Sequence, residues 1–257
     1  MKKIYTTVFT VIVLFVTLFS SFNAAAATGA NEEKLAVHGF LDVGWYSQYV
    51  YWLNGGTGHD ENVLQQSLVF VLEPVGLYAG LWSSYSPEGG ANNDPGDEYD
   101  IFFGIKKRFN GFNFNLCYFY YNLYDLKNTK GDFHGFVLKT DFPKILGITP
   151  FLWLEKDIPV NDGTGGHLYR AGFAYTLKAA KQPINFNLSI AGHDNAFGLR
   201  SEIVSSGKLS VSSNFNAWKV IITPQVNFQQ RLGYKIEDRG ISENKIWYGI
   251  NFSVPLF

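Results

Sequence analysis

The sequence predicts an all-β protein: a closed, antiparallel, up-and-down transmembrane β-barrel of about twelve strands, with ten as the alternative. Three observations predict it. Apolar and polar residues alternate with a period of two in segment after segment, the connections between these segments are alternately long and short, and the chain ends inside such a segment. Period-two alternation is the pattern of a strand with two different faces. Alternating loop lengths are typical of outer-membrane barrels.

Composition is consistent with this fold class. The chain has 257 residues, of which 46% are hydrophobic and 17% aromatic, and its mean hydropathy is near zero. Apolar residues must therefore be interleaved with polar ones rather than gathered in long runs. The formal charge of −1 argues against nucleic acid as a partner. Cys117 is the single cysteine, so no intrachain disulfide is expected, and no cofactor is predicted.

Residues 1–26 have the pattern of a cleaved secretory signal peptide. Lys2 and Lys3 precede an apolar run from about Val8 to Phe22, and an alanine cluster follows at 24–26. A retained membrane anchor is the alternative, but the run is short for a spanning helix. The expected organisation is therefore a signal peptide at 1–26, a short N-terminal periplasmic segment at 27–36 and a single barrel at 37–257.

Alternation places the expected strands at about 37–51, 63–73, 77–85, 98–108, 112–123, 133–141, 148–156, 167–178, 184–192, 207–213, 217–228 and 245–257. The segment 207–213 is short for a strand. Pro150 and Pro224 lie inside two of the runs, and proline cannot donate a ladder hydrogen bond, so we expect bulges or strand starts there.

The connections alternate in length along the whole chain. The long ones are expected at 54–62, 86–97, 125–132, 157–166, 193–206 and 229–244. The short ones are expected at 73–76, 109–111, 142–147, 178–183 and 214–217. In outer-membrane barrels the short turns are periplasmic and the long loops extracellular, and we expect the same orientation here.

Strand number indicates which face points outward. A barrel of about twelve strands is too wide for side chains to fill, so an apolar lumen would leave a void. We therefore expect the apolar face to contact lipid and the polar face to line a hydrated lumen, although a soluble periplasmic barrel with an apolar interior remains the alternative. The lumen-lining candidates are Asp42, Gln48, Gln65, Asp100, Lys106, Arg108, Asn113, Asn115, Glu155, Arg170, Asn185, Asn187, Lys219, Gln225, Asn227 and Asn251.

Aromatic residues on the apolar face gather toward the ends of the expected strands. Belts of such residues are found where lipid headgroups meet hydrocarbon. The candidates for the belts are Tyr49, Tyr85, Tyr99, Tyr120, Phe112, Tyr175 and Trp218. The chain ends at Phe257, which fits the terminal aromatic that the barrel-assembly machinery reads, although Leu256, Val254 and Phe252 continue the apolar face one position away.

Several stretches resemble the TorF-type porins, a family of bacterial outer-membrane barrels. They are "LDVGWYSQYVYW" at 41–52, "GLYAGLWSSYSPE" at 76–88 and "DEYDIFFGIKKRFNGFNFNLCYFYYNLYD" at 97–125. The resemblance covers about 37–125 and departs at Trp52 and Leu53, where the family usually has Arg and Gly. It implies an outer-membrane location in a Gram-negative bacterium. Outer-membrane lipid, lipopolysaccharide, the barrel-assembly machinery and small solutes are the expected partners.

The lumen candidates include both charge signs, and amides dominate. Because no ring of one charge sign is visible, we expect at most weak charge selectivity. A channel for passive diffusion of small hydrophilic solutes is the main hypothesis. The alternative is that these groups pair with one another and plug the lumen, leaving a structural or interaction barrel without conductance.

The five histidines are His38, His59, His134, His167 and His193, and none has zinc-ligand spacing. With Asp94, Asp97 and Glu98, the histidines of "GHDEN" and "GHDNAFG" could form an outer divalent-cation site, but solvated loop residues are the favoured interpretation and no metal is predicted. Ser201, His193 and Asp194 could form a triad. No nucleophile-elbow sequence surrounds Ser201, so an enzyme is not predicted.

Overall fold

The computed structural model describes residues 36–51, 57–87, 97–123, 131–161, 163–179, 182–196, 199–233 and 244–257. Its strands are β1 (Ala36–Tyr46), β2 (Tyr49–Val50), β3 (Thr57–His59), β4 (Val63–Glu73), β5 (Leu77–Tyr85), β6 (Glu98–Phe109), β7 (Phe112–Leu123), β8 (Phe133–Asp141), β9 (Ile148–Pro159), β10 (Gly166–Ala179), β11 (Gln182–Asp194), β12 (Glu202–Ser213), β13 (Phe215–Ala217), β14 (Val220–Arg231) and β15 (Asn244–Pro255). In these residues the structure has no helix of the length and apolar character that a membrane span requires.

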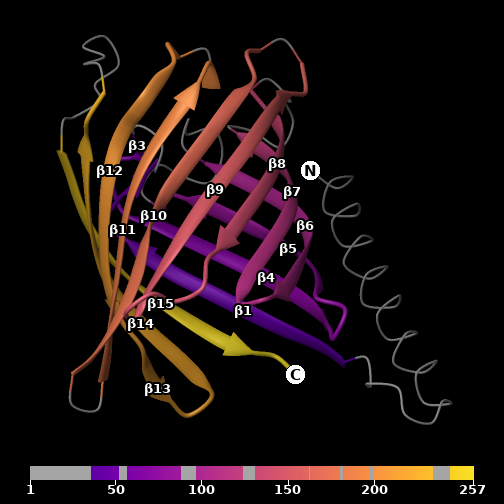
Figure 1. Cartoon of the computed structure of the whole chain (residues 1–257), viewed down its shortest axis with the longest axis vertical. Helices are drawn as coiled ribbons and strands as arrows, with labels where there is room; N and C mark the ends of the chain where they lie inside the picture. The colour runs from indigo at the N-terminus through magenta and orange to yellow at the C-terminus, as the bar shows by residue number, and fades with distance from the viewer. Residues whose placement is uncertain are drawn as a thin grey trace, which may run out of the picture.

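Twelve of these strands form a closed antiparallel ring (Figure 1). Neighbours along the chain pair with each other, β12 pairs with β14, and β15 returns to pair with β1. The short β13 pairs only with β14, and β2 pairs with β3 in a separate small sheet. The predicted closed, up-and-down barrel of twelve strands is therefore confirmed.

Several strand boundaries differ from the sequence prediction, by up to five residues. The first strand ends at Tyr46 instead of continuing to 51, and residues 49–50 form β2. The strand expected at 207–213 is longer, because β12 begins at Glu202. The strand expected at 217 begins at Val220, because Trp218, with a φ of 58°, and Lys219 form the turn between β13 and β14.

Both prolines lie inside strands, at the margin of one ladder. The carbonyl of Pro150 accepts a hydrogen bond from the Phe142 amide, and Phe142 lies one residue past the end of β8. The N–H group that Pro150 lacks would therefore have bonded beyond the paired part of β8. Pro224 lies next to Gln225, which is in the last β12–β14 pair. The register irregularity of the sheet is elsewhere, between Ala191 and His193, so the expectation of bulges at the prolines is wrong.

The predicted signal peptide and the periplasmic segment at 27–36 lie outside the described residues, except for Ala36, which begins β1. The connections alternate in length around the ring as predicted, except that the β8–β9 connection at 142–147 and the β9–β10 connection at 160–165 are equally long. The first ring strand, β1, begins at the end of the barrel where the short turns lie, and the last ring strand, β15, ends there (Figure 1).

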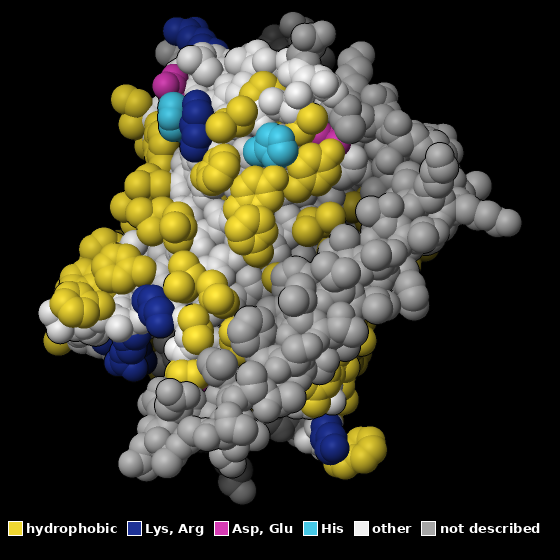
Figure 2. Space-filling view, turned by 90° about the vertical axis from the view of Figure 1, so that its right-hand side faces the viewer, with side chains coloured by type: hydrophobic (Ala, Val, Ile, Leu, Met, Phe, Trp, Pro, Cys, Tyr) yellow, Lys and Arg dark blue, Asp and Glu magenta, His cyan; other side chains and the backbone are white. Residues whose placement is uncertain are grey.

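The two faces of the sheet differ in chemistry. Large apolar side chains such as Phe103, Leu116 and Phe173 point outward and are more than half exposed. On the opposite face, polar side chains such as Glu155 and Asn227 are buried in the barrel. Figure 2 shows hydrophobic side chains across the middle of one outer face, with charged side chains toward its two ends. The outer wall is therefore suited to lipid, and every ladder hydrogen bond is made within an edgeless sheet.

The last residues lie on the outer wall. Pairing of β15 with β1 ends at Pro255, opposite Phe40. The Leu256 amide then donates to the Gly39 carbonyl, and the ring of Phe257 packs on Phe70 of β4 with centroids 6.2 Å apart. Phe257 thus faces outward although strict alternation would place it on the polar side.

The assignment of the outer and inner faces of the sheet can be tested with two adjacent residues on β10. Phe173 points outward and Ala174 points into the lumen. We expect Phe173→Arg to lower the free energy of unfolding by about 2–4 kcal/mol, because it places a guanidinium in hydrocarbon. Ala174→Arg should cost less, because its side chain meets water. Urea unfolding in lipid vesicles measures both values, and an equal loss would contradict the assigned faces.

Candidate functional site

The lumen is the candidate site. Tracing the alternation of each strand through the pair registers gives one continuous inner face. Of the predicted candidates, this face carries Asp42, Gln65, Asp100, Lys106, Arg108, Asn113, Asn115, Glu155, Arg170, Asn185, Asn187, Gln225, Asn227 and Asn251. Gln48 lies in the connection after β1. Lys219 is exposed in the β13–β14 turn and is not in the barrel wall, which corrects that prediction.

Exposure changes along the lumen. Near the short-turn end, inward residues such as Lys106, Asn113 and Lys178 are exposed. Toward the loop end, inward residues such as Asp157 and Gln229 are buried, with exposed fractions of 2% and 1%. The lumen is therefore open to water at the short-turn end and narrow in its loop-side half.

The strand registers show which side chains lie at the height of Lys208 on β12. Stepping from Lys208 through paired residues reaches Arg108 on β6, by way of Ser189, Gly172, Phe151, Asp141 and Asn113. The other way around the ring leads from Lys208 to Gln229 on β14 and Lys245 on β15. If the pair registers of the remaining strands are extended beyond their last pairs, this path reaches the line of β6 at a point numbered 92. Barrel strands are tilted, so these two points lie below and above the level of Lys208. The residue of β6 at the same height as Lys208 is therefore the one midway between 92 and 108, and that residue is Asp100.

Asp100 and Lys208 therefore face each other, because β6 and β12 stand six places apart in the ring of twelve. The same correction for tilt gives one inward residue from every strand at this height, to within one residue. We call this set the lumen ring: Tyr46, Gln65, Ser84, Asp100, Phe119, Gly135, Glu155, Arg170, Ala191, Lys208, Asn227 and Trp247.

The acidic part of the lumen ring lies on β6 and β9. Asp100 follows Glu98 on the inner face of β6, and Asp157 follows Glu155 on the inner face of β9. Tyr121 donates to Glu155 Oε1 at 2.6 Å. One oxygen each of Asp100 and Asp157 has no hydrogen-bond partner among the described residues.

The basic part of the lumen ring lies on β10 and β12. Arg170 donates from Nε to Ser189 Oγ at 2.9 Å, and its guanidinium lies 5.6 Å from the Phe151 ring centroid. The Lys208 ammonium lies 4.7 Å from the Trp247 ring centroid. In the described part of the chain, Lys208 forms no ion pair with a carboxylate. The ring therefore has one acidic sector and one basic sector.

Sequence reasoning missed Lys208 because the strand expected there was short. The signal was present, since Leu209 and Val211 alternate with Lys208 and Ser210 in the sequence. It also missed the inward-facing aromatic side chains, which were all sought on the outer face.

The inward aromatic rings are accommodated by inward glycines. Gly80 is paired with Phe102, Gly104 with Tyr78, Gly172 with Phe151, and Gly249 with Tyr46. A Cβ atom on any of these glycines would meet the partner ring or the neighbouring backbone. Each of these rings therefore packs against the backbone of its glycine partner.

Six of the predicted belt residues lie on the outer side. Tyr85, Tyr99 and Tyr120 point outward near the loop end, Phe112 and Tyr175 near the short-turn end, and Trp218 in a turn at that end. A role for these six as membrane-interface belts stays a proposal.

Tyr49 does not face lipid, which corrects its predicted position. The connection after β1 turns inward, and the Tyr49 hydroxyl donates to Glu98 Oε2 at 2.5 Å. Burial, and then the nearby Glu98 carboxyl, raises the pKa of Tyr49 above its usual range, so its hydroxyl stays a donor. Gln229 of β14 donates to the Tyr51 carbonyl at 3.0 Å. Contacts with both β6 and β14 place this connection across the loop end of the lumen.

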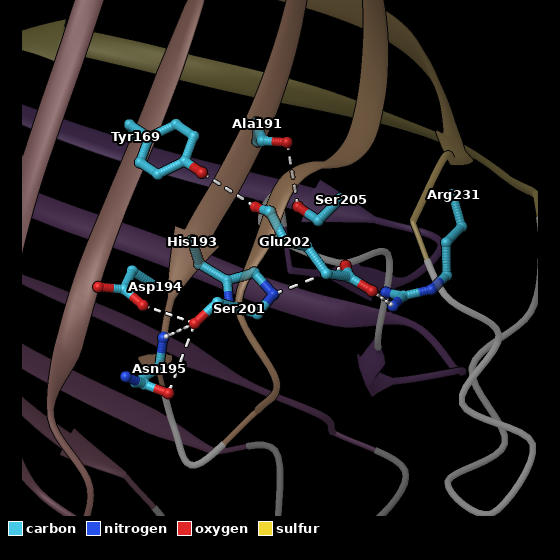
Figure 3. Close-up of polar contacts among 9 residues, drawn as sticks. All are labelled: Tyr169, Ala191, His193, Asp194, Asn195, Ser201, Glu202, Ser205 and Arg231. Atoms are coloured by element: carbon cyan, nitrogen blue, oxygen red, sulfur yellow. Dashed lines mark hydrogen bonds and ion pairs between the residues drawn. The ribbon is translucent and has the colours of Figure 1, made fainter.

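The residues considered for a triad do not assemble one (Figure 3). Ser201 Oγ donates to Asp194 Oδ1 at 2.5 Å. His193 Nε2 instead points to Glu202 Oε2 at 3.7 Å, and its other ring nitrogen has no hydrogen-bond partner among the described residues. Without a serine–histidine contact, the described residues do not form a serine–histidine–aspartate triad here.

The two histidines of the loop motifs are buried, so the expectation of solvated side chains is wrong for them. His59 contacts Asp97 at 3.1 Å and His193 contacts Glu202. Arg231 donates to Glu202 at 2.8 Å, so His193, Glu202 and Arg231 form one buried network (Figure 3). Asp94 lies outside the described residues. Within them, no group of three or more His, Cys, Asp or Glu side chains is arranged to hold a metal ion.

Comparison with known proteins shows the fold. No protein-family model and no curated protein matches the chain, so the resemblance to TorF-type porins stays a prediction. Among solved structures, the chain is similar to a KdgM porin, with a TM-score of 0.54, 9% identity and coverage of 84% of this chain and 98% of that one. It is also similar to a NanC porin, with a TM-score of 0.53, 9% identity and coverage of 85% and 99%.

A KdgM porin in complex with disordered oligogalacturonate is similar as well, with a TM-score of 0.52, 7% identity and coverage of 85% and 98%. The chain thus has the fold of outer-membrane porins. Together with the apolar outer wall, this fold makes it a protein of the bacterial outer membrane.

The glycine–aromatic packing can be tested at Gly135. A Cβ there would lie 2.5 Å from Cε2 of Tyr121, so Gly135→Ala must push that ring toward the lumen. We expect a loss of about 1–3 kcal/mol in unfolding free energy, as in other overpacked sites. Gly207→Ala is the control, because its nearest neighbour is the flexible end of Leu232 at 3.3 Å, and it should be neutral or stabilising. Equal effects in urea unfolding would refute the packing.

The buried network at Glu202 gives a second test. Glu202→Gln removes the carboxylate partner of Arg231, whose side chain is 4% exposed, and should lower the unfolding free energy by about 3 kcal/mol. Asp60→Asn is the matched control, because Asp60 pairs with Lys245 but its side chain is 71% exposed, and it should cost less than about 1 kcal/mol. Similar losses for both variants would mean that the network contributes little.

Proposed function

We propose that this chain is a porin-like channel through which small hydrophilic solutes diffuse passively. The observation that carries the proposal is the inner wall, which carries polar side chains from exposed Lys106, Asn113 and Lys178 at the short-turn end to the lumen ring. One hydrophobic cluster around Tyr78, Cys117 and Val137 interrupts it. An apolar exterior with a polar interior is the arrangement of a water-filled membrane barrel. The fold shared with KdgM and NanC porins supports it.

Weak charge selectivity is part of the proposal. The lumen ring contains two acidic positions, Asp100 and Glu155, and two basic ones, Arg170 and Lys208. Single-sign rings produce strong selectivity in channels, and a balanced ring does not. The narrow ring also limits the solutes to small ones.

The partners follow from the same proposal. The outer wall would contact outer-membrane lipid and, at the loop end, lipopolysaccharide. Phe257 lies exposed on the outer wall at the end of the chain, where the barrel-assembly machinery could read it.

A plugged structural barrel is the second candidate, and the burial of the loop-side half of the lumen favours it. The connection after β1, held by Tyr49 and Tyr51, adds to that burial. Conductance separates the two functions.

We expect stepwise currents from the purified protein in planar bilayers, with a reversal potential near zero in a potassium chloride gradient. Asn227→Trp should reduce the step size, because it adds a large side chain to the lumen ring. Val226→Trp is the matched control on the outer face, where the residue is 52% exposed, and should leave the step unchanged. Flat traces from folded protein, verified by heat-modifiable gel migration, would refute the channel and support the plugged barrel.

A further inference from the structure

We infer that the lumen ring is a dipolar filter that favours small zwitterions, which are solutes carrying both an ammonium and a carboxylate. This inference rests on the proposed channel and names the solute class that its narrowest part fits. It is carried by the placement of Asp100 and Lys208 at one height of the lumen, on strands that stand opposite each other in the ring.

The first step is the separation of the charges. Asp100 lies on β6 and Lys208 on β12, half the ring apart and level with each other. Neither forms an ion pair with a described residue. Opposite charges fixed on opposite walls produce an electric field across the lumen, and the low-dielectric wall of the barrel concentrates it.

The second step is the unused bonding capacity. Asp100 and Asp157 are 6% and 2% exposed, and each has an oxygen on the lumen side of its strand that no described residue contacts by a hydrogen bond. A buried carboxylate oxygen without a donor is costly, and an ammonium would supply the donors that are missing. On the other side, the Lys208 ammonium rests on the Trp247 ring and is available to a carboxylate.

The third step excludes simpler ligands. No three carboxylates or histidines of the described residues are close enough to hold a metal ion. A simple anion or cation is attracted by one sector and repelled by the other, so it gains little. A zwitterion can turn each charge toward the sector of opposite sign as it passes, and gains from both.

Proteoliposome swelling tests the inference with two solutes of similar size: L-glutamine, a zwitterion, and arabinose, which is neutral. The wild-type protein should admit glutamine faster than arabinose. Lys208→Gln should lower the ratio of the two rates by roughly three- to ten-fold, the effect of one charge contact at partial dielectric screening. The double variant Glu98→Gln, Asp100→Asn removes the opposite charge and should lower the ratio similarly.

Lys178→Gln is the matched control, because it removes the same charge from the exposed short-turn end of the lumen and should leave the ratio unchanged. Heat-modifiable migration verifies that each variant is folded. If both solutes enter and no ring variant changes the ratio, the dipolar filter is refuted and the channel stands. If neither solute enters vesicles that contain folded wild-type protein, the proposed channel and the filter both fail.

Discussion

The fold depends on one constraint: in lipid, every backbone N–H and C=O group must find its partner inside the protein. Pairing of β15 with β1 meets it by removing the last free edge of the sheet. The ring is complete at Pro255, the last residue of β15. Once the sheet is closed, its two faces have different solvents, and the apolar face can only be the outer one.

Closure with tilted strands also decides which residues meet inside. Asp100 and Lys208 are far apart in the sequence, but the accumulated register of twelve strands brings them to one height. The same inner face must hold the rings of Tyr78, Phe102 and Phe151, and it does so by pairing each with a glycine. Such pairs let a large ring lie along the wall of the barrel.

The fold could be predicted closely from the sequence, because a period of two with one residue type per face is a local signal. The site could not be predicted to the same degree. Tyr49 continues the alternation of the first strand, and nothing local reveals that the chain turns inward after Tyr46. Lys219 fits the polar register but lies in a turn set by the positive φ of Trp218. The height of a residue in the lumen depends on the pair registers of all the strands around the ring added together. A local sequence pattern does not contain this information.

The chain itself shows two ways of treating buried charge. Glu202 is neutralised by Arg231, with the two side chains in direct contact, which is what stability alone requires. Asp100 and Lys208 are left apart, although an unpaired buried charge costs free energy and apolar residues in their place would avoid that cost. The number of strands fixes the distance between Asp100 and Lys208 across the barrel. A change of side-chain rotamer therefore cannot bring the two charges together and remove the electric field between them. A solute that carries both charges can reduce this field for the time it spends in the ring, which gives the unpaired arrangement a function that stability does not explain.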